Sequence, residues 1–226
     1  MSSVRLFRKR LLAAGAALAL TGATATAVVS LGTTSALAAD SCNGYVALTF
    51  DDGPGGTTQQ LLNVLKTNNV RATLFNIGQN AQSNAALVRA EVAAGHWIGN
   101  HSYTHPHMAS MGQSQMTSEL QRTQQAIQAG GAPAPKVFRP PYGEQNGTLQ
   151  SAASALGLRT VTWDVDSKDW NGASTQAIVS AAGSLQNGGI ILMHDQYQAT
   201  RDAVPQIVKN LSSRGLCPGM ISPSTG

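Results

Sequence analysis

Residues 45–54 read YVALTFDDGP and join a buried-strand pattern to a charged turn. The apolar run at residues 45–48 predicts a strand, which Gly53 and Pro54 end. Asp51 and Asp52 therefore lie at the mouth of this strand. Adjacent carboxylates repel each other and are costly to bury together unless a cation or a proton lies between them. A plain turn explains this stretch taken alone, so a chemical role depends on what later strands bring to the same place.

Strand and helix patterns alternate along the rest of the chain. Apolar runs predict further strands at residues 72–77, 97–100, 137–138, 158–163 and 190–193, and a short one near Leu216. Amphipathic stretches predict helices at residues 57–69, 83–95, 113–129, 146–156, 174–185 and 200–214. Such alternation is typical of βα units around a largely parallel sheet. A complete eight-stranded barrel needs about 250 residues. We therefore expect an α/β fold, a distorted (β/α) barrel of about seven strands, with an open doubly wound sheet as the alternative.

Residues 1–38 have the composition of a secretory signal peptide. Four basic residues precede the apolar stretch 11–20, and the small residues Ala36 and Ala38 fit a cleavage site. No uninterrupted apolar span of membrane-anchor length follows. We therefore expect residues 39–226 to form one secreted, extracellular domain without a membrane span.

The charge balance disfavours nucleic acid or an anionic membrane as a partner. Four of the 15 basic residues lie in the signal segment and none of the 11 acidic ones do, which leaves 11 basic against 11 acidic residues. A neutral chain lacks the attraction that polyanions need. Aromatic residues are only 5% of the chain, which disfavours a carbohydrate-binding module without catalysis.

The chain contains two cysteines, Cys42 and Cys217. In an exported protein they are expected to form a disulfide that ties the two ends of the domain together. Two free, buried thiols are the alternative.

Polar residues follow the predicted strands at the end where βα folds gather their active sites. After Asp51 and Asp52, these are His101, His105, Arg139, Asp164, Asp166, Asp169, Trp170, His194 and Asp195. His101 and His105 stand at i and i+4, so both imidazoles face one way if the segment forms a helical turn. Two imidazoles and one carboxylate are a common ligand set for zinc or a similar divalent ion. The second carboxylate then stays free to take a proton from water.

The remaining histidines differ in what the sequence predicts for them. His194 lies on a separate element and fits a third metal ligand, a core histidine or a general acid held by a carboxylate. His96 and His107 are interpreted as ordinary histidines before a strand and in a turn. Asp164 alternates into a strand and fits a structural role.

Five motifs in this order resemble those of the polysaccharide deacetylases, also called carbohydrate esterase family 4 or the NodB homology domain. They are Thr49-Phe50-Asp51-Asp52-Gly53-Pro54, His101-Ser102-Tyr103-Thr104-His105, Arg139-Pro140-Pro141-Tyr142-Gly143, Asp166-Ser167-Lys168-Asp169-Trp170 and Leu192-Met193-His194-Asp195. The match spans nearly the whole of residues 39–226. The stretches Cys42-Asn43-Gly44-Tyr45 and Gly215-Leu216-Cys217 most resemble the secreted actinobacterial acetylxylan esterases of that family.

The resemblance implies a NodB-like distorted barrel and a role for each matching residue. Asp51 matches the general base, Arg139 the residue that orients it, and His194 the general acid with Asp169 as its partner. Three residues match the ligands of zinc or cobalt: Asp52, His101 and His105. The backbone N–H of Tyr142 matches the oxyanion donor. Trp170 and Leu192 match the walls of the acetyl pocket.

The function that the resemblance implies is deacetylation of a polysaccharide by a secreted, metal-dependent, monomeric hydrolase. O-acetyl esters of xylan are the expected substrate. Removal of N-acetyl groups from chitin oligomers or peptidoglycan is the alternative.

Overall fold

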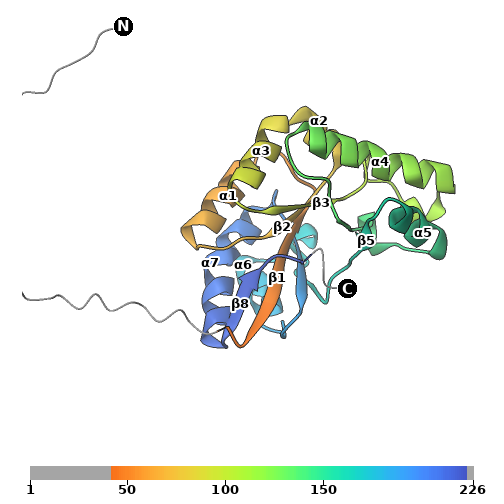
Figure 1. The fold of residues 1–226 in the computed structure, drawn as a ribbon. Helices are drawn as coiled ribbons and strands as arrows, with labels where there is room; N and C mark the ends of the chain where they lie inside the picture. The colour runs from red at the N-terminus through yellow and green to blue at the C-terminus, as the bar shows by residue number, and fades with distance from the viewer. Residues whose placement is uncertain (1–41, 223–226) are drawn as a thin grey trace, which may run out of the picture. The chain divides into compact units, whose positions relative to one another are not determined.

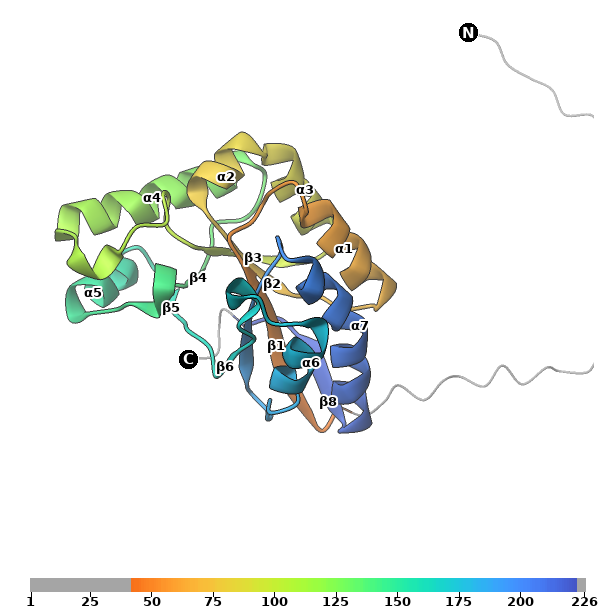
Figure 2. The same ribbon diagram turned by 180° about the vertical axis from the view of Figure 1, so that it is seen from behind.

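The computed structural model describes residues 42–222, whose centre is a parallel sheet curled into an incomplete barrel (Figure 1, Figure 2). The strand order is β5-β4-β3-β2-β1-β7-β6, and β8 pairs with β1. The distorted (β/α) barrel is thus confirmed. The strands are β1 (Gly44–Asp51), β2 (Thr73–Asn76), β3 (Trp97–Asn100), β4 (Val137–Phe138), β5 (Arg159–Thr160), β6 (Val165–Asp166), β7 (Ile190–His194) and β8 (Leu216–Gly219).

Strand β1 is the centre of the sheet and pairs with three other strands. Ala47 pairs with both Ile190 of β7 and Gly219 of β8, so these strands lie on opposite edges of β1. Along one edge of β1, β8 pairs with the first half of the strand and β2 pairs with its last residues. The register sets Asp51 directly beside His194. The charged end of β1 is therefore flanked by the ends of β2 and β7.

Helices cover the outer face of the sheet. They are α1 (Thr58–Thr67), α2 (Gly78–Ser83), α3 (Ala85–Ala93), α4 (Gln113–Ala129), α5 (Gly147–Ala155), α6 (Thr175–Ala182) and α7 (Gln198–Ser213), with 3₁₀ turns η1 (Met108–Ser110), η2 (Pro141–Gly143) and η3 (Asp169–Asn171). Figure 1 and Figure 2 show α1, α3 and α7 side by side along the strands, and α1 packs against both of the others. Leu48, Leu61 and Val204, each fully buried, belong to the apolar core between sheet and helices. Burying such side chains is the main favourable term in folding.

Several helix boundaries agree with the sequence prediction. Helix α4 begins and ends as predicted. Asn146 and Ser174 cap α5 and α6, because their side chains accept the backbone N–H groups of Leu149 at 2.9 Å and Ala177 at 3.3 Å. Thr57 precedes α1 but makes no capping bond with its side chain.

The predicted strand at residues 158–163 is confirmed only over Arg159–Thr160, which forms β5, because the rest of this stretch crosses the gap in the barrel. Val161 N–H still donates to Phe138 of β4, but Asp164 N–H donates to Ile190 of β7. The chain thus leaves one edge of the sheet and joins the other, which gives two short strands, β5 and β6. The described residues therefore form eight strands, where about seven were expected. Between β5 and β6, the two edges of the sheet are joined by the connecting chain and not by hydrogen bonds between strands.

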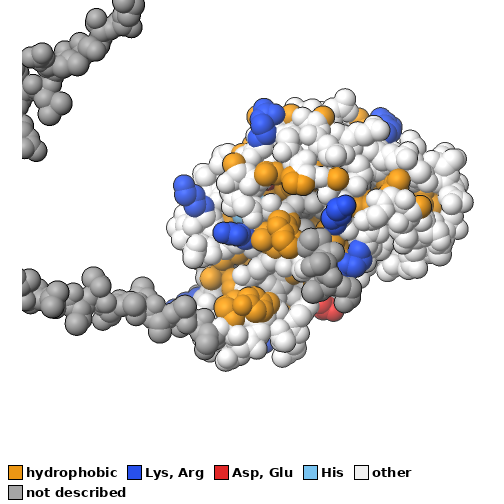
Figure 3. Space-filling model, in the orientation of Figure 1, with side chains coloured by type: hydrophobic (Ala, Val, Ile, Leu, Met, Phe, Trp, Pro, Cys, Tyr) orange, Lys and Arg blue, Asp and Glu red, His pale blue; other side chains and the backbone are white. Residues whose placement is uncertain are grey.

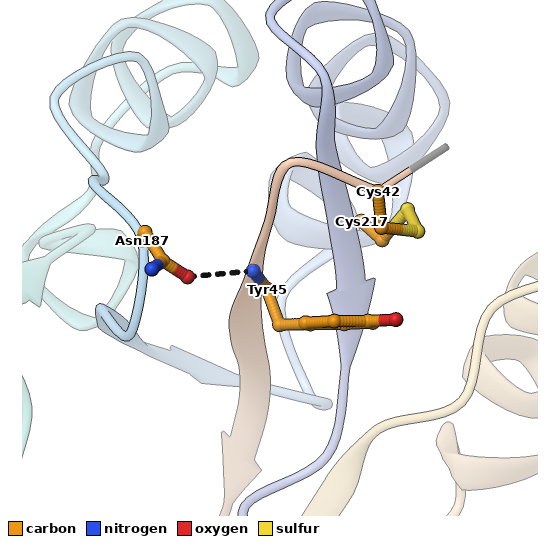
Figure 4. Close-up of a disulfide and its surroundings, with 4 residues drawn as sticks. All are labelled: Cys42, Tyr45, Asn187 and Cys217. Atoms are coloured by element: carbon orange, nitrogen blue, oxygen red, sulfur yellow. Dashed lines mark hydrogen bonds between the residues drawn. A yellow bond between two sulfur atoms is a disulfide. The ribbon is translucent and has the colours of Figure 1, made fainter. Parts of the chain in front are cut away.

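The disulfide between Cys42 and Cys217 is confirmed (Figure 4). It ties the start of β1 to β8, where Tyr45 and Cys217 are paired in the sheet. Tyr45 N–H also donates to the side chain of Asn187 at 2.9 Å, on the opposite edge of β1. The bridge closes a loop across a sequence separation of 175, for which chain entropy predicts about 5 kcal/mol of stabilisation.

The predicted signal peptide, residues 1–38, lies outside the described residues. Within residues 42–222, no helix has the length and apolar character needed to cross a bilayer. On the face seen in Figure 3, the Lys and Arg side chains lie apart from one another and form no continuous basic patch. That arrangement agrees with the expectation that nucleic acid is not a partner, which stays a prediction.

Candidate active site

The carboxyl ends of the strands open into one cleft of about 400 Å³. That volume is typical of a small-molecule or substrate site. The lining residues include nine of those named from the sequence: Asp51, Asp52, His101, His105, Tyr142, Asp166, Trp170, Leu192 and His194. Arg139 and Asp169, also predicted, lie buried behind the cleft wall and reach it through Asp51 and His194.

Asp52, His101 and His105 converge as a metal-ligand set requires. Oδ1 of Asp52 lies 3.5 Å from Nε2 of His101 and 3.5 Å from Nε2 of His105. This oxygen is buried and has no hydrogen-bond partner, which is rare for a carboxylate unless a cation accounts for it. In the described part of the chain, this is the only group of three or more His, Cys, Asp or Glu side chains close enough to share an ion. Two imidazoles and a carboxylate suit a divalent metal ion, and His194 lies outside the group.

The ring orientation of His101 is fixed from behind. Its Nδ1 lies 2.7 Å from the backbone carbonyl oxygen of Arg139. Because a carbonyl oxygen only accepts, Nδ1 carries the hydrogen and Nε2 keeps its lone pair, which faces Asp52. The side chain is 3% exposed. His101 is therefore held in the tautomer that a metal ligand needs.

Residues 101–105 do not form the helical turn that the i, i+4 spacing would need, yet the two imidazoles do meet, with ring centroids 5.0 Å apart. The segment is an irregular loop in which Ser102 (φ 61°) and His105 (φ 57°) adopt the left-handed conformation. Such residues carry strain that the surroundings must hold in place. Glu119 of α4 does so here, because its carboxylate accepts two backbone N–H groups of the loop, each at 2.8 Å.

The turn that carries Asp52 is held by residues that the sequence analysis missed. Asp52 is itself left-handed, with φ 72°. Asn80 of α2 donates its side-chain amide to the backbone oxygen of Asp52 at 2.8 Å, and Asn84 does the same for Pro54 at 3.3 Å. Burial alone raises the pKa of Asp52, but the adjacent His101 imidazole, with those of His194 and His105 nearby, holds it below its ordinary value.

Asp51 is held by a buried guanidinium. Its Oδ1 accepts from Nη1 of Arg139 at 2.8 Å, and Arg139 is fully buried with its guanidinium carbon 4.2 Å from the centroid of the Phe75 ring. Thr49 and the backbone oxygen of Thr162 take further Arg139 hydrogens, at 2.8 Å each. Oδ2 of Asp51 faces the cleft, 3.7 Å from Nε2 of His101. The second oxygen of Asp51 is therefore available to accept a proton.

His194 and Asp169 form a buried pair on the opposite wall. Nδ1 of His194 lies 2.7 Å from Oδ1 of Asp169, whose Oδ2 accepts the backbone N–H of His194 at 2.7 Å and the hydroxyl of Thr200 at 2.6 Å. Burial raises the pKa of Asp169, but these hydrogen bonds and the His194 charge bring it below its ordinary value. Burial lowers the pKa of His194, yet the Asp169 hydrogen bond and the charges of Asp51, Asp169 and Asp52 raise it overall. His194 thus keeps its proton to a higher pH than an ordinary imidazole does, and its Nε2 faces the cleft 4.0 Å from Asp52.

Aromatic side chains form the cleft rim. The Trp170 indole N–H donates to Oδ1 of Asp166 at 3.2 Å, which fixes a ring that is about half exposed. Tyr142 stacks on His107, with ring centroids 4.1 Å apart, so the His107 imidazole packs against the Tyr142 ring at the rim. Trp163 and Pro140 also line the cleft and were not predicted. The available signal for Trp163 was an aromatic residue at the carboxyl end of the strand predicted at residues 158–163.

Two other polar residues near the strands have structural roles. Asp164, as expected, pairs with the sheet, since its Oδ2 accepts the N–H of Ile190 at 2.8 Å. His96 is buried, and its Nδ1 accepts the N–H of Ala72 at 3.1 Å. Burial lowers the pKa of His96 to about 4, so this imidazole is neutral at ordinary pH.

The sequence matches the family model described as polysaccharide deacetylase over residues 38–161. This chain belongs to the polysaccharide deacetylase family. Its relatives include a bifunctional xylanase/xylan deacetylase from Cellvibrio japonicus, which is 58% identical over 187 residues, covering 82% of this chain and 28% of that protein. A peptidoglycan-N-acetylglucosamine deacetylase from Bacillus cereus is 36% identical over 176 residues, covering 75% of this chain and 64% of the relative. The chain thus spans less than two thirds of the length of these curated relatives.

A solved structure agrees with the family assignment. The family 4 carbohydrate esterase from Streptomyces lividans, in complex with acetate, superposes with a TM-score of 0.80 at 61% sequence identity. The match covers 82% of this chain and 96% of that one. The similarity therefore extends over nearly the whole of the esterase domain in that structure.

The buried pair gives a pH-dependent prediction for this member of the polysaccharide deacetylase family. Asp169→Asn removes the anion that raises the pKa of His194, so the imidazole loses its proton at lower pH than in the wild type. If His194 acts as a general acid, activity at neutral pH falls by about 10²-fold, and the alkaline limb of the kcat/KM profile moves to lower pH. Steady-state kinetics across pH 5–9 checks this. An unmoved alkaline limb contradicts the pairing.

Proposed function

We propose that this chain is a secreted, metal-dependent deacetylase that hydrolyses O-acetyl esters of xylan. The observation that carries the proposal is the partnerless Oδ1 of Asp52, faced by two imidazoles, in a cleft that also presents Asp51 and His194. The 58% identity to a protein described as a xylanase/xylan deacetylase supports xylan as the polysaccharide.

Asp52, His101 and His105 are the residues that would hold a divalent cation, zinc or cobalt. When bound, such a cation supplies a Lewis acid for the acetyl carbonyl and lowers the pKa of water. The fit rests on the donor atoms, two neutral nitrogens and one carboxylate oxygen, and on the held tautomer of His101.

Asp51 is assigned as the general base. Arg139 occupies its Oδ1 and holds the carboxylate in one orientation, so Oδ2 takes the proton of the attacking water. The Arg139 guanidinium is buried and forms an ion pair with Asp51 at 2.8 Å.

His194 is assigned as the general acid on the opposite wall. Asp169 holds Nδ1, which leaves the proton on Nε2 directed into the cleft for the departing sugar oxygen. The backbone N–H of Tyr142 is assigned to the developing oxyanion. Tyr142 has φ 60° and lies in the cleft lining, on the turn that follows Arg139. Leu192, 5% exposed, and the half-exposed Trp170 are assigned to the acetyl methyl group.

Secretion is proposed from two features. Residues 1–38 have a signal-peptide pattern. The Cys42–Cys217 disulfide is typical of proteins that fold in an oxidising compartment. The proposal treats the chain as a monomer that needs no partner protein for the reaction.

A second candidate is removal of N-acetyl groups from chitin oligomers or peptidoglycan. The 36% identity to a peptidoglycan-N-acetylglucosamine deacetylase favours it. An alkoxide is a better leaving group than an amide nitrogen, so the same residues perform ester cleavage more readily.

Acetate release from acetylxylan, N-acetylglucosamine oligomers and peptidoglycan, measured side by side with one enzyme preparation, tests the substrate. We expect kcat/KM to be highest on acetylxylan. A higher value on an N-acetylated substrate would transfer the proposal to that glycan. The Asp51→Asn variant is the control in every assay, because it distinguishes enzymatic from spontaneous acetate release.

A further inference from the structure

A buried polar cluster lies beneath the turn that carries Asp51 and Asp52, and the proposed reaction does not use it. Its members are Glu91 of α3, Asn76 at the end of β2, and Asp195 directly after β7. They are 1%, 0% and 5% exposed. Two carboxyl groups buried side by side are costly if both are ionised.

Glu91 and Asn76 are joined by one hydrogen bond and leave one oxygen each without a partner. Nδ2 of Asn76 donates to Oε2 of Glu91 at 2.7 Å. Oε1 of Glu91 and Oδ1 of Asn76 are both buried, and neither has a hydrogen-bond partner. If Glu91 is ionised, both atoms are acceptors without a donor. Exchanging the nitrogen and oxygen of the Asn76 amide does not help, because a carboxylate oxygen then faces an amide oxygen.

No other donor is available in this part of the structure. The cavity is lined by Phe50, Asp51, Gly53, Thr58, Leu61, Leu74, Asn76, Glu91 and Asp195. Lys, Arg and His are absent from this lining. The space among these side chains is too small to hold a water molecule. The hydroxyl of Thr58 is already given to Asp195. A proton is therefore the cation that fits.

We propose that Glu91 is a neutral carboxylic acid whose proton joins Oε1 to Oδ1 of Asn76 and closes a two-hydrogen-bond acid–amide pair. In this pair each side chain donates once and accepts once, so both orphaned oxygens are satisfied.

The pair has a positioning role because it supports the metal-ligand turns. The backbone oxygen of Asn76 accepts the N–H of His101 at 3.1 Å. A Cβ placed on Gly53 would lie 3.4 Å from Oδ1 of Asn76 and 3.3 Å from Oδ2 of Asp195. On one side, the acid–amide pair thus lies against Gly53, the residue after Asp52. On the other side, the backbone of Asn76 holds the N–H of His101.

The electrostatic surroundings agree with a neutral Glu91. Burial raises its pKa to about 8, with the charge of Asp195 adding to the shift and the Asn76 hydrogen bond opposing it. The charged groups facing it are Asp195, after β7, and Asp51, at the end of β1. Burial likewise raises the pKa of Asp195, whose Oδ2 accepts from Thr58 and whose backbone oxygen accepts from Arg201. The charge of Asp195 therefore disfavours a negative charge on Glu91.

This assignment predicts a window of pH dependence. In the unfolded chain Glu91 loses its proton near its ordinary pKa of 4.5, whereas the folded chain keeps it up to about pH 8. The folded state therefore binds the extra proton between these values. The stabilisation is complete below pH 4.5 and is lost as the pH rises towards 8.

The direct test is carbon-13 NMR of the full secreted chain labelled at the glutamate side-chain carboxyl carbon. The chain has only three glutamates, Glu91, Glu119 and Glu144. The Glu91→Gln variant assigns the Glu91 signal by its disappearance. We expect that signal at the neutral-acid position at pH 6 and a titration near pH 8. A signal at the carboxylate position at pH 6 overturns the proposal.

A second measurement compares wild type and Glu91→Gln in urea unfolding between pH 5 and 8. Glutamine places an N–H donor where the acid has its O–H, so the variant keeps both hydrogen bonds without titrating. The unfolding constant of the wild type should rise relative to the variant by up to tenfold per pH unit. A pH-independent ratio overturns the proposal. Other titrating groups cancel in this comparison.

Glu119→Gln is the matched control. Glu119 accepts three hydrogen bonds, from the backbone N–H groups of Tyr103 and Thr104 and from the Thr104 hydroxyl. Glutamine replaces one acceptor oxygen there with a donor, so this variant should be less stable than the wild type but should lack the pH window of stability predicted for Glu91.

Metal affinity tests the positioning role. Glu91→Ala should bind zinc at least about tenfold more weakly, the size of effect expected for groups that orient metal ligands. Glu91→Gln should restore wild-type affinity at pH 6, and equal weakening in both variants contradicts the role. These readouts do not depend on the glycan.

Discussion

Asp52→Ala is expected to lose both the bound metal and the esterase activity. The wild-type carboxylate places a buried, partnerless oxygen 3.5 Å from two imidazole nitrogens. Alanine removes this oxygen, so only two of the three proposed metal-ligating atoms remain. Loss of Lewis-acid stabilisation worth several kcal/mol corresponds to a fall of about 10³ or more in kcat. Metal content by elemental analysis and acetate release from acetylxylan, measured on the same sample, check both parts.

Chelation provides the parallel experiment on the wild-type protein. Dialysis against a strong chelator should abolish activity, and zinc or cobalt should restore it in the wild type but not in Asp52→Ala. Asp202→Ala is the matched control, because Asp202 is an exposed carboxylate on α7 that bonds only to Gln198 in the same helix. It should keep metal and activity. Full activity of the chelated wild type would show that the Asp52, His101 and His105 group is not a metal site needed for the reaction.

The fold was largely predictable because its signals are local. Helix α4 carries its pattern over four turns, and Asn146 and Ser174 are side-chain caps that the sequence displays directly. Helix α2 was missed because it has no such signal. It begins after Ile77 without a side-chain cap, and its first N–H groups are satisfied by the backbone oxygens of Ser102 and Tyr103, at 2.9 and 3.0 Å. A helix held by distant loop carbonyls cannot be read from its own residues.

The identities of the site residues were predictable from motifs, whereas their local geometry was not. The spacing of His101 and His105 would bring the rings together in a helical turn, but they meet instead in an irregular loop with two left-handed residues. Glu119 of α4 holds this loop by accepting two of its backbone N–H groups. Likewise, nothing near Asp52 in the sequence indicates that Asn80 holds its carbonyl oxygen. The motifs mark the groups that contact the cleft. The residues that hold them come from separate elements and appear only when the chain is folded.

Asp51→Asn is expected to lose activity but keep its metal, which would distinguish the general base from the metal ligands. Asparagine has nearly the shape of aspartate, and its side-chain oxygen can still accept from Arg139 at the position of Oδ1. It cannot take a proton from water. We therefore expect kcat to fall by about 10²–10⁴-fold, the contribution of a general base, while metal content stays at the wild-type level.

Comparing the metal contents of Asp51→Asn and Asp52→Ala shows which of the two carboxylates is the metal ligand. Both residues are neighbours on one turn, yet only Asp52 faces the imidazole pair with a partnerless oxygen, while Asp51 is held by a buried guanidinium. If Asp51 were the ligand and Asp52 the base, the metal contents of the two variants would be reversed. His194→Ala should also keep its metal and lose activity to a similar degree, because it removes the acid on the opposite wall. Near-wild-type kcat in Asp51→Asn would show that the proton of the attacking water goes elsewhere.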